Sequence, residues 1–196
     1  KSSYGTWGFN LTAFSGITYL WNHPEQDRPI GSQGVYPDHL GFVLGPTMMI
    51  AALLNSRRSG KGVTIDLAQI EGTAAVLGTT YLETSVNGDD PKPRGNHYAL
   101  AAPHGVYRCQ GDDRWCVISV RDDAEWRSFC RVIGRAELVS DRRFTSLQSR
   151  LNNRTELDAI VKEWTGARPA EEIMSRCQAA GVPASVVQTG ADLLKD

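Results

Sequence analysis

The sequence predicts a mixed α/β protein built from two domains, and three observations support this prediction. Near the start, a long apolar helix, a short extended segment and a second helix follow one another, as in an α/β layered domain. Residues 87–94 are rich in proline, glycine and aspartate and have the composition of a linker. After it, two β-rich segments flank a polar turn and lead into helices, which indicates a smaller α+β domain.

We therefore divide the chain of 196 residues into four segments. Residues 1–86 are expected to be part of a large α/β domain, and residues 87–94 to be the linker. Residues 95–184 are expected to form the small α+β domain, and residues 185–196 to return toward the large domain.

The clearest single element is a helix expected from about Asp38 to Arg58. Pro37 disfavours a helical conformation at Tyr36, so the helix should begin at or just after Asp38. Pro46 fits either a first helical position or a kink. The stretch Ser59-Gly60-Lys61-Gly62 should end the helix. One buried face is predicted by apolar and small residues at intervals of three and four, at Leu40, Val43, Leu44, Thr47, Met48, Ala51, Ala52 and Leu54.

Asp38 has two interpretations that are compatible with each other. As an N-cap, its carboxylate would accept hydrogen bonds from the first backbone amides of the helix. As a nucleophile, the same carboxylate would be kept ionised by the helix dipole and would attack an electrophilic substrate.

The remaining elements follow from periodicity and turn residues. A short helix should bury Phe9, Leu11, Phe14 and Ile17, and residues 22–36 should be a loop. Residues 63–67 form a short strand or an extended entry to a helix over 69–85. After the linker we expect a hairpin of strands 105–109 and 115–120, helices over 122–133, 153–165 and 169–180, an edge strand over 182–187 and a last helix from Asp192. Asp122 or Asp123 should cap the first of these helices.

Composition excludes several classes of protein. Hydrophobic residues make up 41% and charged residues 22%, with a net charge of −1, as in soluble globular proteins. There is no basic excess for nucleic acid, no signal peptide and no apolar run that reaches a membrane span, so a cytoplasmic protein is expected.

The four cysteines, Cys109, Cys116, Cys130 and Cys177, form no C-x-x-C pair and have no nearby histidine. A metal site is therefore not expected. Isolated cysteines among apolar neighbours indicate reduced, buried thiols, and a disulfide between Cys109 and Cys116 across the hairpin is the alternative.

Three groups of residues carry a family resemblance. Asp38 is followed by Arg57-Arg58-Ser59-Gly60-Lys61-Gly62 and Asp66. A second group holds Arg94-Gly95-Asn96 and Pro103-His104-Gly105-Val106-Tyr107, and a third holds Ala179-Ala180-Gly181-Val182-Pro183-Ala184. Together they resemble, in order and over nearly the whole chain, the class III CoA-transferase family, which includes formyl-CoA transferase, carnitine CoA-transferases and α-methylacyl-CoA racemase.

The resemblance implies that Asp38 is the nucleophile. In the family, such a carboxylate attacks an acyl-CoA thioester to give a mixed anhydride, CoA then forms an enzyme-bound thioester, and an acceptor acid takes the CoA. Coenzyme A and acyl-CoA are thus implied as substrates, with no permanently bound cofactor. Residues 99–102 depart from the glycine-rich loop of the formyl-CoA transferases, so formyl and oxalate substrates are not implied.

The resemblance also has consequences for assembly. The family fold has a Rossmann-like large domain that begins with a nucleotide-binding segment, so most CoA contacts are expected before Lys1, and a final segment is expected after Asp196. An interlocked homodimer, or a hetero-oligomer, is implied, and this chain should expose apolar surface meant for a partner. Neither nucleic acid nor a membrane is expected as a partner.

Six further residues are candidates for substrate or CoA binding. His104 could supply a proton or a hydrogen bond to an acyl group, or it could be a turn residue bonded to the backbone. His39 could interact with the neighbouring Asp38. Asn10 could line the site or make a local backbone bond. Arg57, Arg58 and Lys61 could hold a CoA phosphate, although cations at a helix end more often satisfy its carbonyl groups.

Two other functions remain open. An α-methylacyl-CoA racemase pairs the aspartate with an upstream histidine, but Trp7 stands at the corresponding place, and tryptophan cannot exchange a proton. A non-catalytic subunit or binding module would not need to keep Asp38. The sequence therefore favours a transferase.

Overall fold

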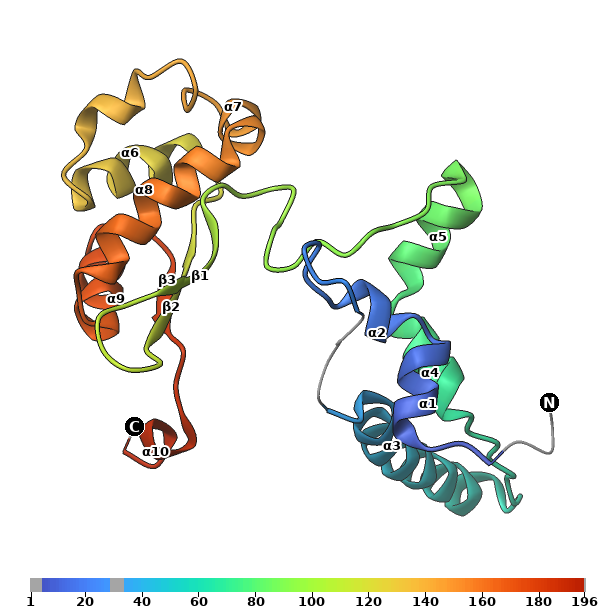
Figure 1. The fold of residues 1–196 in the computed structure, drawn as a ribbon. Helices are drawn as coiled ribbons and strands as arrows, with labels where there is room; N and C mark the ends of the chain where they lie inside the picture. The colour runs from blue at the N-terminus through green and yellow to red at the C-terminus, as the bar shows by residue number, and fades with distance from the viewer. Residues whose placement is uncertain (1–4, 29–33, 196) are drawn as a thin grey trace. The chain divides into compact units, whose positions relative to one another are not determined.

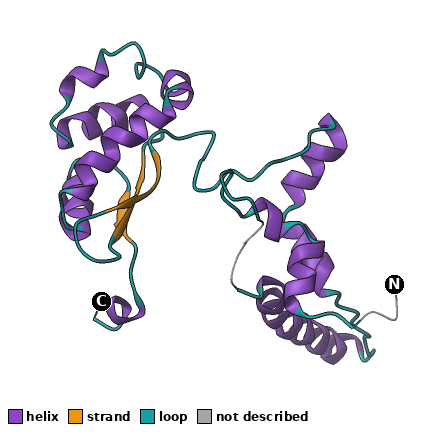
Figure 2. Ribbon diagram, in the orientation of Figure 1, coloured by secondary structure: helices purple, strands orange, loops and turns teal. Residues whose placement is uncertain are grey.

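The computed structural model describes residues 5–28 and 34–195. These residues form two compact units that divide between Gly95 and Asn96, which we call unit 1 and unit 2. Each unit is described by itself. Strands occur only in unit 2 among the described residues, and the predicted mixed α/β class is confirmed (Figure 2).

Unit 1 consists of helices in the residues that the structure describes. These are α1 (Gly8–Phe14), α2 (Ile17–Leu20), α3 (Tyr36–Ser59), α4 (Gln69–Val76) and α5 (Gly78–Asn87). Helices α1, α3 and α4 contact one another (Figure 1). Leu11 and Ile17 are buried as predicted, but Phe9 and Phe14 are 63% and 71% exposed, so the prediction for these two residues is wrong.

Three predicted boundaries in unit 1 are corrected. Helix α3 begins at Tyr36 rather than at Asp38, because proline is tolerated in the first turn, where its missing N–H has no intrahelical partner. Pro46 lies inside α3 without ending it. Residues 61–68 form no strand, so of the two predictions for 63–67 the extended entry to a helix remains. The predicted helix over 69–85 is divided at Leu77 into α4 and α5.

The predicted burial of the α3 face is also wrong. Among the described residues, Pro37 is the buried residue of this helix. The predicted face itself is partly or fully exposed, at Leu40, Val43, Leu44, Thr47, Met48, Ala51, Ala52 and Leu54. Apolar residues also lie on its other sides, including Phe42, Met49, Ile50 and Leu53. A helix that is apolar all round is normally buried within a larger body, and the spacing rule for a half-buried helix does not describe it.

Helix α3 also corrects the expectation about membranes. By length and composition alone, its 24 residues are apolar enough to cross a membrane. One such helix is weak evidence, because the core helix of a soluble protein has the same length and composition.

Unit 2 packs helices against a three-stranded antiparallel sheet. The strands are β1 (His104–Arg108), β2 (Trp115–Ser119) and β3 (Ala184–Val186), in the order β1-β2-β3. The hairpin and the edge position of β3 are confirmed. The helices are α6 (Asp123–Val132), the 3-10 helix η1 (Ala136–Val139), α7 (Leu147–Asn152), α8 (Arg154–Gly166), α9 (Ala170–Ala179) and α10 (Gly190–Leu193).

Local sequence signals explain most of the element ends in unit 2. Asp122 caps α6, since its carboxylate accepts hydrogen bonds from the backbone N–H groups of Ala124 and Glu125. Helix α7 was not predicted, although Ser146 provides its cap by accepting from the Ser149 N–H. Arg114 forms ion pairs with Glu171 and Asp192, and so joins the hairpin to α9 and α10. The expected return of residues 185–196 toward a large domain stays a prediction.

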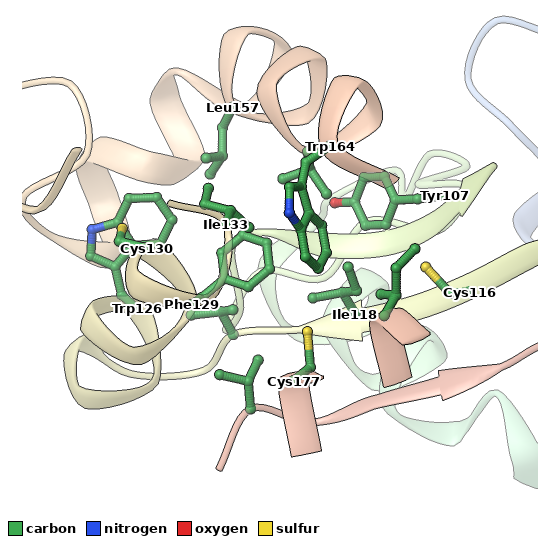
Figure 3. Packing of buried hydrophobic residues seen from close by; sticks show 14 of the residues in the cluster. Tyr107, Cys116, Ile118, Trp126, Phe129, Cys130, Ile133, Leu157, Trp164 and Cys177 are labelled. Carbon is green, nitrogen blue, oxygen red and sulfur yellow. The ribbon is translucent and has the colours of Figure 1, made fainter. Parts of the chain in front are cut away.

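The core of unit 2 lies between the sheet and helices α6, α8 and α9 (Figure 3). Phe129 is fully buried and meets Trp164 edge to face at 6.0 Å between ring centroids. All four cysteines are free and buried, so the predicted reduced state holds and the Cys109–Cys116 disulfide is not formed. Burial raises the pKa of Cys177 to about 11 and that of Cys130 to about 12, which keeps both thiols protonated at neutral pH.

Candidate functional site

Asp38 is the third residue of α3, inside the first turn of the helix. Val35 precedes the helix at the N-cap position and provides no side-chain cap, so the N-cap interpretation of Asp38 is wrong. The Asp38 side chain is exposed. An ionised carboxylate is favoured in the first turn of a long helix, because the helix dipole is positive there. The position therefore suits an accessible, charged nucleophile.

The side chain of Gln69 forms a hydrogen bond with the Asp38 carboxylate. Its side-chain Nε2 donates to Asp38 Oδ1 at 3.1 Å across a sequence separation of 31 residues. Gln69 is the first residue of α4, and the Thr73 hydroxyl donates to its backbone carbonyl at 2.8 Å, one turn further on. The packing of α4 on α3 thus places an amide donor on one oxygen of Asp38.

Gly8 lies against the other oxygen of the same carboxylate. A Cβ atom built on Gly8 would stand 2.6 Å from Asp38 Oδ2 and 2.7 Å from Val35 Cγ1. Real Cβ atoms do not make such contacts, so the backbone of α1 approaches Asp38 as closely as it does only because residue 8 has no side chain. Glycine at this position is a condition of the site's geometry.

Gly41 leaves similar room beside the donor, three residues after Asp38. A Cβ atom on Gly41 would stand 3.1 Å from Gln69 Nε2 and 3.3 Å from its Cγ. The Gln69 side chain therefore lies across the helix surface that Gly41 leaves open. Gly8, Gly41 and Gln69 were all missed in the sequence, because contacts between residues so far apart in the chain leave no periodic signal.

No hydrogen bond within the described residues joins the other candidates in unit 1 to Asp38. Asn10 is exposed, and its Oδ1 accepts from the Trp7 N–H at 3.3 Å, which is the local backbone bond expected as its alternative role. His39 is exposed, and its ring makes no hydrogen bond to the residues that the structure describes. Arg57 and Arg58 are exposed in the last turn of α3, and Lys61 follows its Gly60 C-cap. Their binding roles stay predictions.

His104 belongs to unit 2, at the start of β1. Its Nδ1 lies 2.9 Å from Ser119 Oγ on β2, and its ring lies 5.5 Å from that of Tyr98. Burial, followed by the positive charges of Arg154 and His97, holds the pKa of His104 below its usual value. The lowered pKa favours the neutral imidazole, which can donate or accept a hydrogen bond. The alternative of a turn residue bonded to the backbone is wrong, because His104 begins β1 and its ring bonds to the Ser119 side chain. The acyl-binding role of His104 stays a prediction.

No group of histidine, cysteine and acidic residues in the described ranges could hold a metal ion. What unit 1 offers is a carboxylate with one oxygen on an amide N–H and the other beside a glycine backbone. Such an arrangement can support attack by the carboxylate on a carbonyl carbon.

We expect Gly8→Ala to abolish most of the activity of the whole protein, because the added methyl group would displace the Asp38 carboxylate. Gly78→Ala is the matched control, since a Cβ at Gly78 meets nothing within 4 Å. The measurement is the rate of the thioester exchange that the family resemblance implies, for both variants, with circular dichroism to check folding. A Gly8→Ala protein as active as Gly78→Ala would contradict the described approach of α1 to Asp38.

The model of CoA-transferase family III matches residues 1–196, the whole chain. A probable CoA-transferase of Mycobacterium tuberculosis is 34% identical over 193 residues, which are 95% of this chain and 24% of that relative. Succinyl-CoA–D-citramalate CoA-transferase of Chloroflexus aurantiacus is 28% identical over 197 residues, covering 100% of this chain and 48% of the relative.

A similar protein of different specificity is acetyl-CoA:oxalate CoA-transferase of Acetobacter aceti, 33% identical over 88% of this chain and 44% of that relative. Among solved structures, a CAIB/BAIF family protein from Brucella suis superposes with a TM-score of 0.88 at 25% identity, over 98% of this chain and 50% of that one. The chain thus spans at most about half the length of these relatives.

Proposed function

Because this chain belongs to CoA-transferase family III, we propose that the whole protein moves coenzyme A from an acyl-CoA thioester to a carboxylic acid, with Asp38 as the nucleophile. The observation that carries the proposal is the Asp38 carboxylate itself, exposed in the first turn of α3 and held through Oδ1 by Gln69. Coenzyme A and its thioesters are the substrates, and no resident cofactor is needed.

The proposed reaction proceeds by covalent catalysis. An oxygen of Asp38 attacks the acyl carbon and forms a bond to it, and the C–S bond of the thioester breaks. CoA departs as the thiolate, and Asp38 now carries the acyl group as a mixed anhydride. The thiolate then attacks Asp38 Cγ, releases the donor acid and forms an aspartyl thioester. The acceptor carboxylate attacks the same carbon and displaces the thiolate, which finally attacks the new acyl group and regenerates Asp38.

The accessory roles are proposed on chemical grounds. Arg57, Arg58 and Lys61 supply positive charge suited to a CoA phosphate, and neutral His104 supplies a hydrogen bond to an acyl group.

The apolar exposed surface of α3 supports assembly with further protein, as a homodimer or a hetero-oligomer. Relatives named as α and β subunits of a succinyl-CoA–L-malate CoA-transferase support the second form. A cytoplasmic location is proposed from the reduced cysteines.

Isotope exchange tests the proposal without knowledge of the natural acceptor. The whole protein is incubated with succinyl-CoA and labelled succinate, and then with acetyl-CoA and labelled acetate. A transferase that keeps CoA on the enzyme between half-reactions exchanges label into the thioester of an acid it accepts. Hydrolysis of the acyl-CoA without exchange of label from any acid tested would indicate a hydrolase instead.

Racemisation is expected to be absent. Trp7, at the place of a racemase histidine, is 79% exposed and has no group that exchanges a proton at neutral pH. In deuterium oxide, the whole protein should therefore introduce little deuterium at the α-carbon of 2-methylacyl-CoA, as measured by mass spectrometry. Exchange as fast as turnover would restore the racemase and overturn the transferase assignment.

A further inference from the structure

We propose that Gln69 is a catalytic residue, whose side-chain amide stabilises the negative charge that develops on Asp38 Oδ1 during transfer of CoA. The inference rests on the proposed function, since it concerns the two steps in which Asp38 Cγ is itself attacked. It gives a chemical role to a residue whose side chain meets the nucleophile directly.

The two oxygens of Asp38 have different surroundings. Oδ1 accepts a hydrogen bond from Gln69 Nε2 at 3.1 Å. Oδ2 faces the Gly8 backbone, close enough that a Cβ there would stand at 2.6 Å, and no hydrogen bond to Oδ2 is found within the described residues. Oδ2 therefore keeps its lone pairs for attack on the thioester, and Oδ1 becomes the carbonyl oxygen of the resulting anhydride.

Charge on Oδ1 follows from the balance of bonds. When CoA thiolate attacks Cγ, the S–C bond forms and the carbonyl electron pair moves onto Oδ1. The pair returns as the bond from Cγ to Oδ2 breaks, and the donor acid leaves with Oδ2. Attack by the acceptor carboxylate on the aspartyl thioester repeats the sequence, with CoA thiolate as the leaving group.

The position of Gln69 is fixed before the reaction begins. Its backbone starts α4, and its side chain lies along the open surface at Gly41, where a Cβ would approach Nε2 to 3.1 Å. An amide already aimed at the oxygen that gains charge needs no reorganisation in the transition state. Removing one such donor typically lowers kcat by about a hundred- to a thousandfold.

The experiment replaces Gln69 in the whole protein. Gln69→Met keeps the length and helix propensity of the side chain but removes its N–H donors. Gln69→Glu keeps its shape, lacks the amide and places a negative charge beside the developing oxyanion. Gln148→Met is the matched control, since Gln148 is exposed on α7 and its amide donates to Asn152 on the same helix. Succinyl-CoA or acetyl-CoA, whichever the wild type exchanges, is the donor.

For both Gln69 variants we expect kcat to fall by about a hundredfold or more, with KM within about threefold of the wild-type value. Hydroxylamine added after the donor should still modify Asp38, since the attack by Oδ2 is retained. Gln148→Met should match the wild type. If Gln69→Met fails to fold, as judged by circular dichroism, Gln69→Glu carries the comparison.

Two results would overturn the inference while leaving the proposed function intact. One is a Gln69 variant whose kcat equals that of the wild type. The other is a variant in which KM rises while kcat is unchanged. In both cases hydroxylamine would still modify Asp38. Absence of any modification at Asp38 in the wild type would instead remove the proposed function, and the role of Gln69 with it.

Discussion

Asp38→Asn is expected to lower thioester exchange by the whole protein by about a thousandfold or more, the usual scale for loss of a covalent nucleophile. Asparagine has nearly the same shape, and its side-chain oxygen can still accept the hydrogen bond from Gln69 Nε2. It cannot form a mixed anhydride, because its amide is a poor nucleophile. The exchange of labelled acid into its thioester measures the effect.

The fold should tolerate this change. Asp38 is exposed and caps no backbone amide of α3, so we expect the free energy of unfolding to change by about 1 kcal/mol or less. Asp89→Asn, in the exposed segment after α5, is the matched control and should keep full activity. An Asp38→Asn protein with wild-type exchange would remove Asp38 from the mechanism.

Arg150→Met is expected to have the largest effect on stability. The Arg150 side chain is fully buried, and its guanidinium donates to the backbone carbonyls of Ala102 and Phe144 and to Asp123 Oδ1. Methionine fills the space but leaves both buried carbonyl groups without a donor, at about 1–3 kcal/mol each. We therefore expect the unfolding free energy of unit 2 to fall by about 3 kcal/mol or more.

Peptide-level hydrogen exchange at β2 measures this loss locally and needs no assumption that both units unfold together. The matched control is Arg127→Met on the exposed face of α6, where a change within about 0.5 kcal/mol is expected. Equal protection of β2 in both variants would show that Arg150 is dispensable for the core.

Local patterns predicted much of unit 2. Alternating apolar residues around a polar turn identified the β1–β2 hairpin, and Pro183 indicated an edge strand, because both signals depend on neighbouring residues. Asp122 was recognised as a possible cap for the same reason. The burial of Arg150 could not be foreseen, since its three acceptors lie up to 48 residues away in the chain.

The long helix α3 shows where such patterns fail. Its existence follows from the spacing of its apolar residues. It ends within the predicted stretch Ser59-Gly60-Lys61-Gly62, at Gly60, whose φ is 69°. The prediction of its start was wrong. Pro37 disfavours a helical conformation at Tyr36, but proline is well tolerated in the first turn of a helix, and the second effect prevails here. Its burial was misjudged, because what covers a helix that is apolar all round is decided by protein outside its own sequence window.

At the candidate site, sequence provided Asp38 but none of its neighbours. Gly8 and Gln69 come from segments 30 and 31 residues away, and their roles depend on how α1 and α4 pack on α3. A glycine at the start of a short helix and a glutamine at the start of another carry no chemical signature of their own.

The most direct test of the account is to locate the covalent intermediate. The whole protein is mixed with an acyl-CoA that it exchanges, treated with hydroxylamine and digested, and the peptide that contains Asp38 is examined by mass spectrometry. We predict a hydroxamate at Asp38 in the wild type, dependent on the donor, and none in Asp38→Asn. A hydroxamate on another residue, or active turnover without any modification, would contradict the account.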